Sequence, residues 1–316
     1  MNKKSVLVSL FLSCSLFCFT QKKTVSTESD LKTIKQDTNY IISLNNSSRD
    51  LLGTGSLMRA DSFSKKALSI SEKLNFKNGT ALSLNMLGQI KQMQGEYGKA
   101  LEYLFRGLSI AEEIKDKTRT SRLLSTIGSN YLFQNNYQKA QDYYFKSLKL
   151  EEELNNKIGI ARAYANIGIT FKNKGDSSAK KNNLAYAKAK FYPIALDYFL
   201  KSLTIAETLG EERGIEVNLG NIGGIYLHIY QYDKALEFFE KSLALSEKHG
   251  DKEGSAIKLY NIGNLIAEKG DSAKSLDAKR NEYKKALSYL NHSLKLSDEA
   301  GDKQGSMLCH KTISHL

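Results

Sequence analysis

A forty-residue period is the feature that most constrains the fold of this chain. Glycine recurs at this interval from Gly88 to Gly128 and Gly168, and again from Gly223 to Gly263. An alanine follows each of these glycines, and a leucine lies eight residues after each alanine; the alanines are Ala100, Ala140, Ala195, Ala235 and Ala286. Self-similarity at a fixed period predicts an array of repeats in which each repeat contacts only its neighbours.

Each repeat has the periodicity of two helices. In the second half of one repeat, Tyr137, Ala140, Tyr144 and Ser147 follow one another at spacings of three and four, which places them on one helix face. The small residues Gly128 and Ala140 suit the point where two antiparallel helices cross closely. We expect the aromatic side chains to fill the core around that crossing rather than to bind a cofactor. The pattern therefore predicts an all-α array of antiparallel helix pairs.

The period also sets the expected repeat boundaries. We place repeats near 37–76, 77–116, 117–156, 157–211, 212–251 and 252–302, followed by a closing helix at 303–316. Two repeats carry extra residues between their helices, and both insertions open with Lys-Gly-Asp-Ser, at Lys174–Ser177 and Lys269–Ser272. Insertions in a repeat array usually form loops, so we expect loops at both places. The first insertion is strongly basic.

The amino-terminal segment has the composition of a secretory signal. Lys3 and Lys4 precede an apolar run from Ser5 to Phe19, which is short for a membrane span. We expect a signal peptide at 1–20 and a polar linker at 21–36. Soluble export, to the periplasm or outside the cell, is the first interpretation. Lipid anchoring through Cys14 and an uncleaved anchor are the alternatives.

Charge and cysteine content narrow the function classes. The net charge is +12, but the lysines are interleaved with Asp and Glu along the helices, which is typical of a solvated surface. No basic stripe with interleaved aromatic residues is evident, so we do not expect nucleic-acid binding. The five histidines and three cysteines form no strong metal-ligand spacing, and no catalytic or phosphate-binding motif is present. We expect no enzyme activity, no cofactor and no metal.

The repeat pattern resembles the tetratricopeptide repeat (TPR) family. Gly128, Tyr131, Ala140, Tyr144 and Ser147 match the positions of that family's small and aromatic residues. The forty-residue period is similar to the long-repeat subtype of LGN/Pins, kinesin light chain and Rap-type arrays. The resemblance extends from about residue 37 to the end of the chain. It implies a right-handed superhelical solenoid of about six helix pairs plus a closing helix.

The resemblance also implies where a ligand would bind. TPR arrays bind peptides or helices in a concave groove lined by the first helix of each pair. Residues on the side of that helix away from its packing face are therefore groove candidates: Arg122, Ser129, Arg162, Lys172 and Asn264. Arg122 and Arg162 occupy equivalent positions of adjacent repeats and are suited to paired hydrogen bonds with a carboxylate. The alternative is that both arginines are simply solvated.

These observations favour an exported, non-enzymatic scaffold that binds a protein or peptide in its groove, and the two arginines would suit an acidic ligand. The alternative is a sensory or regulatory module of a bacterial signalling system, acting with a separate kinase or transcription regulator. We expect no transmembrane span after signal cleavage.

Overall fold

The computed structural model describes residues 38–180 and 183–316, and the predicted signal peptide and linker lie outside these ranges. The described residues are helical, with no strand among them, which confirms the predicted all-α array of helix pairs. They fall into two compact units, which divide between Thr170 and Phe171. Among the described residues, no helix is both long and apolar enough to span a membrane.

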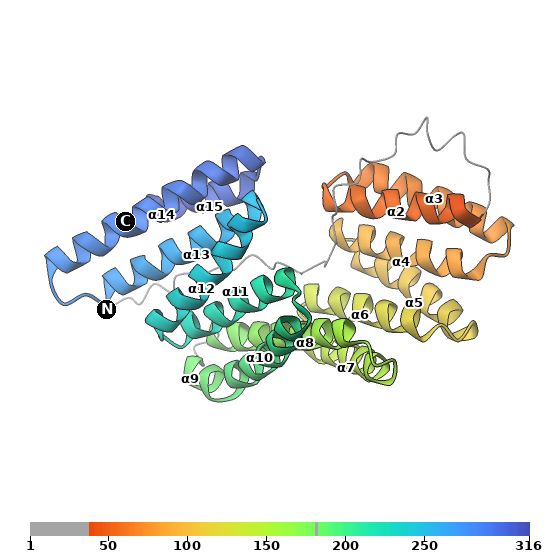
Figure 1. The fold of residues 1–316 in the computed structure, drawn as a ribbon, viewed down its shortest axis with the longest axis horizontal. Coiled ribbons are helices and arrows are strands. Elements are labelled where there is room, and N and C mark those ends of the chain that lie inside the picture. Colours follow the sequence, from red (N-terminus) through yellow and green to blue (C-terminus); the bar gives the residue numbers. More distant parts are fainter. Residues whose placement is uncertain (1–37, 181–182) are drawn as a thin grey trace. The chain divides into compact units, whose positions relative to one another are not determined.

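Successive helices in each compact unit are joined by short turns (Figure 1). The first unit contains α2 (Thr38–Gly53), α3 (Leu57–Lys73), α4 (Lys77–Met93), α5 (Tyr97–Glu113), α6 (Lys117–Phe133), α7 (Tyr137–Glu153) and the first part of α8 (Lys157–Lys180). The second unit contains the rest of α8 followed by α9 (Leu184–Tyr186), a π-helix η1 (Ala187–Phe191), α10 (Tyr192–Leu209), α11 (Glu212–His228), α12 (Tyr232–Lys248), α13 (Lys252–Asp271), α14 (Leu276–Ala300) and α15 (Lys303–Ile313).

The turns are built from residues that suit helix ends. Gly95, Gly250 and Gly301 have positive φ angles just after a helix, a conformation that glycine adopts without strain. Several following helices begin with a capping carboxylate: Asp116 accepts a hydrogen bond from the backbone N–H of Arg119, and Asp251 accepts one from that of Gly254. These local signals explain why the helices begin and end at the same place in successive repeats.

The repeat glycines lie where the second helix of the pair presses a large side chain against the first. A Cβ atom at Gly128 would lie 2.9 Å from the ring of Tyr144, and one at Gly223 would lie 2.7 Å from Phe239 Cδ1. Both rings are almost fully buried. The repeat glycine is therefore required by close packing, as its period indicated.

The expectation of loops at the two insertions was wrong. In the first, α8 continues through the Lys-Gly-Asp-Ser sequence to Lys180, and α9 and η1 then lead directly into α10. In the second, α13 and α14 extend to 20 and 25 residues, whereas α11 and α12 have 17 each. Both insertions contain few strong helix breakers, so the added residues lengthen helices that already exist.

Candidate functional site

The five predicted groove residues differ in how far the structure leaves them accessible. Arg122 is exposed on α6, and Arg162 is partly buried on α8. Asn264 is partly buried on α13. Their predicted role in ligand binding stays a prediction. A hydrogen bond of 3.3 Å from Asn166 Nδ2 to Ser125 Oγ joins α8 to α6, so the two arginines are carried by neighbouring first helices.

Ser129 also takes part in contacts between first helices. Its hydroxyl accepts a hydrogen bond of 2.8 Å from Gln92 Nε2 on α4. Between α2 and α4, Asn45 Nδ2 donates to Ser83 Oγ at 2.9 Å in the same manner. Polar side chains therefore link consecutive first helices, and Ser129 contributes to that link.

Lys172 was expected in the groove, but the structure buries it. Only 7% of the residue is exposed, and Lys172 Nζ lies 3.0 Å from Asp176 Oδ2. Tyr192 donates its hydroxyl hydrogen to Asp176 Oδ1 at 3.0 Å, and His228 Nε2 lies 3.3 Å from the same oxygen without forming a hydrogen bond to it. The rings of Tyr192 and His228 stack, with centroids 5.2 Å apart. We call these four residues the Asp176 centre.

Burial and charge set the protonation states in the Asp176 centre. Burial opposes ionisation of Asp176, but the Lys172 ammonium and the hydrogen bonds outweigh it and hold the pKa below its ordinary value. Burial lowers the pKa of His228 to about 4, against the attraction of Asp176. Burial and the Asp176 carboxylate raise the pKa of the Tyr192 hydroxyl, which therefore stays a hydrogen-bond donor. The centre is therefore an ion pair within α8, bound by the Tyr192 hydroxyl, with a neutral histidine stacked on the tyrosine ring.

The Asp176 centre explains the Lys-Gly-Asp-Ser sequence of the first insertion. A Cβ atom at Gly175 would lie 2.6 Å from the Tyr192 ring, so glycine makes room for the ring and Asp176 then binds its hydroxyl. The second insertion repeats the arrangement, with the Tyr283 ring against Gly270 and the Tyr283 hydroxyl donating to Asp271. In both insertions, the hydroxyl of the tyrosine near the turn between the two helices therefore binds a carboxylate.

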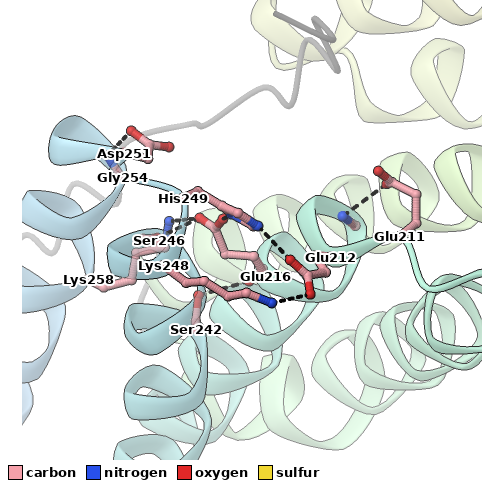
Figure 2. A network of polar contacts seen from close by, with 11 residues as sticks. Glu211, Glu212, Glu216, Ser242, Ser246, Lys248, His249, Asp251, Gly254 and Lys258 are labelled. Atoms are coloured by element: carbon pink, nitrogen blue, oxygen red, sulfur yellow. Dashed lines mark hydrogen bonds and ion pairs between the residues drawn. The ribbon is translucent and has the colours of Figure 1, made fainter. Parts of the chain in front are cut away.

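A second polar cluster surrounds Glu216 of α11, and Figure 2 shows side chains from α12, α13 and the turn between them converging on it. Only 5% of Glu216 is exposed. Lys258 Nζ of α13 and Ser246 Oγ of α12 both donate to Oε1, at 2.5 and 2.6 Å. His249 Nδ1 lies 3.3 Å from Oε2, and its Nε2 lies 3.0 Å from Glu212. Burial opposes ionisation of Glu216, but Lys258 and the hydrogen bonds hold its pKa below the ordinary value.

The first compact unit contains an equivalent serine–glutamate contact, in which the two residue types lie on the opposite helices. Ser121 Oγ of α6 donates to Glu151 Oε1 of α7 at 2.6 Å. Ser121 and Glu216 both lie seven residues before their repeat glycine, and Glu151 and Ser246 both lie eleven residues after their repeat alanine. The serine and the glutamate have therefore exchanged helices between the two repeats.

The sequence contains signals for both clusters that the forty-residue period does not reveal. Lys172 and Asp176 are four residues apart, which pairs them on a helix only if α8 continues past Lys174. Glu216 and Glu151 stand at positions where other repeats have Ala81 and Ala111. Among the described residues, no group of three or more metal-binding side chains lies together.

Comparison with known proteins supports the fold. Models of the tetratricopeptide repeat match residues 40–113, 176–248 and 121–154, which together make up more than half of the chain. No curated protein matches the sequence.

Solved structures of low identity share the architecture. BtubC (BKLC) from P. vanneervenii is 16% identical, with a TM-score of 0.59 over 78% of this chain and 92% of that one. The apo form of RapI is 21% identical, with a TM-score of 0.58 over 87% and 95%. A Rap protein complexed with Competence and Sporulation Factor is 15% identical, with a TM-score of 0.61 over 91% and 78%. The repeated helix pairs, the packing of their glycines and the family models lead to one conclusion: this chain belongs to the tetratricopeptide repeat family.

Proposed function

We propose that the protein is an exported, non-enzymatic scaffold that binds a protein or peptide segment along the first helices of its repeats. The TPR array is a fold suited to protein–protein interaction. The observation that carries the proposal is the position of Arg122, exposed on a first helix whose neighbour carries Arg162 at the equivalent position. Guanidinium groups spaced along one surface favour a ligand with carboxylates.

Replacing both Arg122 and Arg162 by alanine is expected to weaken partner binding by about tenfold, since an interfacial charge pair contributes on the order of 1 kcal/mol when partly exposed. A photo-crosslinking amino acid at position 122 in the full chain, expressed in its own host, would capture the partner for that measurement. The matched control places the same amino acid at Lys149, which is exposed on the second helix α7. Equal capture at both positions, or unchanged affinity of the double variant, would count against the first-helix surface.

Export is supported by the basic and apolar pattern of residues 1–20. We expect the mature protein to begin near Gln21 and to be recovered outside the cytoplasm, and intact-mass spectrometry of the fractionated protein measures both. A mass increased by acyl chains on Cys14 would indicate the lipid-anchored form instead. A cytoplasmic protein that retains Met1 would refute export.

A regulatory array acting with a separate kinase or transcription regulator is the second candidate. The complex of a Rap protein with Competence and Sporulation Factor is an example in which this fold binds a factor. The two candidates predict the same crosslinking surface and differ in the partner captured there: a kinase or regulator supports the second.

A further inference from the structure

The first insertion builds a basic and aromatic surface in the second compact unit. Residues 177–196 contain four lysines and no Asp or Glu. Lys188 Nζ lies 3.8 Å from the centroid of the Tyr230 ring, and Lys190 Nζ lies 5.3 Å from that of Tyr186. Lys174 Nζ lies 5.5 Å from the Phe191 ring, which meets Tyr186 edge-on. We call the surface formed by Lys174, Tyr186, Lys188, Lys190 and Tyr230 the insertion patch.

The lysines of the insertion patch differ in their partners from lysines at helix ends. Among the residues that the structure describes, Lys174, Lys188 and Lys190 form no ion pair and contact aromatic rings instead. Several lysines at helix ends behave differently, because they pair with a glutamate on the other helix of the same repeat: Lys77–Glu113, Lys117–Glu153, Lys248–Glu212 and Lys252–Glu299. The three lysines of the insertion patch therefore lack the pairing that neutralises these lysines at helix ends.

One residue of the insertion patch, Tyr230, has a strained backbone conformation. Tyr230 has a φ angle of 62°, in the left-handed region that large side chains rarely adopt, and equivalent turns carry Gly95 or Asn135. Despite this, the Tyr230 side chain is 54% exposed and the Tyr186 side chain 42%. The Asp176 centre fixes the base of the patch, since Tyr192, directly after η1, is bound to Asp176 of α8. A π-helix such as η1 is itself frequent at functional sites.

The surroundings of the insertion patch indicate the kind of ligand. The Tyr230 ring lies 6.1 Å from the Tyr232 ring. Burial and the nearby Glu268 carboxylate raise the pKa of Tyr232. The insertion patch combines lysine ammonium groups with exposed tyrosine rings, which complements a segment that carries both carboxylates and apolar side chains.

We propose that the insertion patch binds a short acidic segment of a protein partner. Carboxylates of the segment lie against the lysine ammonium groups, and its apolar side chains pack on the exposed rings of Tyr186 and Tyr230. This surface is formed by the inter-helix insertion and not by the first-helix residues Arg122 and Arg162. It is therefore a second binding surface, independent of the one proposed above.

Fluorescence anisotropy of the full chain with a fluorescein-labelled copolymer of glutamate and tyrosine tests the inference. Replacing Lys188 and Lys190 together by glutamate is expected to raise the Kd by about tenfold, because two attractions become repulsions. The matched control replaces Lys139 and Lys146 by glutamate. These lysines also lie over aromatic rings, in the first compact unit, and the net charge changes equally. We expect less than about a twofold change for the control.

A third variant removes an aromatic ring without changing the charge. Tyr230→Asn suits the left-handed turn, as Asn135 does in an earlier repeat, so its melting temperature should not fall while its Kd still rises several-fold. Equal weakening in the two lysine pairs would show that only net charge matters and would overturn the proposal. So would tighter binding of oligothymidylate or phosphatidylglycerol vesicles that is lost in the same patch variant. The Arg122/Arg162 double variant should keep its affinity for the copolymer at the patch, which separates this result from the fate of the first-helix proposal.

Discussion

Replacing Asp176 by alanine is expected to lower the free energy of unfolding by about 3 kcal/mol, because removing one partner of a buried ion pair leaves the other charge uncompensated. The charge left behind is Lys172, of which only 7% is exposed. The substitution also leaves the Tyr192 hydroxyl without its acceptor. Urea unfolding followed by circular dichroism measures the total, and hydrogen exchange on α8, α10 and α11 shows whether the loss is local.

The second Lys-Gly-Asp-Ser sequence supplies the matched control. Asp271 also accepts from a tyrosine and pairs with Lys279, but its side chain is 59% exposed. Asp271→Ala should therefore cost less than about 1 kcal/mol. Adding Lys172→Met to Asp176→Ala should recover most of the lost stability, because it removes the buried charge. Equal losses at Asp176 and Asp271 would refute the view that the first pair is a buried one.

Two equivalent positions are expected to give stability profiles of opposite slope with pH. His228 and Glu268 both lie five residues after their repeat glycine, next to the turn tyrosine of the preceding repeat. Burial lowers the pKa of His228 from 6.5 to about 4, so the unfolded chain takes up the proton first and stability falls as pH drops through that range. Burial and Asp271 raise the pKa of Glu268 from 4.5 to about 7, so stability falls as pH rises through that range.

Each effect amounts to about 3 kcal/mol at most, and single variants separate them. The free energy of unfolding of His228→Phe, relative to that of the parent protein, should rise as pH falls from 6.5 to 4. Phenylalanine suits the site because Phe133 stacks on Tyr97 at the equivalent position. The free energy of unfolding of Glu268→Gln, relative to that of the parent protein, should rise as pH rises from 4.5 to 7. The groups facing His228 are Asp176, Lys172 and Tyr192, and those facing Glu268 are Asp271 and Tyr232. Differences that stay flat with pH would contradict both assignments.

The helix pairs could be predicted from the sequence because their determinants are local. Gly128 and Tyr144 lie in one repeat, and their contact recurs as Gly223 and Phe239. The buried clusters could not be predicted in the same way, because they depend on residues that break the period. Lys172 looked accessible when assigned by its repeat position alone, yet the continuation of α8 brings it against Asp176. The role of Arg122 depends on a ligand, which the repeat pattern does not specify.

The exchange of serine and glutamate between repeats limits how such a protein can be rebuilt by recombination. Joining α6 to α12 would place Ser121 opposite Ser246, two small hydroxyl groups that a core accommodates easily. Joining α11 to α7 would place Glu216 opposite Glu151, two carboxylates confined to one dry space, where like charges repel strongly. The same shuffling event is thus tolerable in one direction and harmful in the other. The helices of this array share a shape, but α7 and α11 carry buried carboxylates that oppose their pairing with each other.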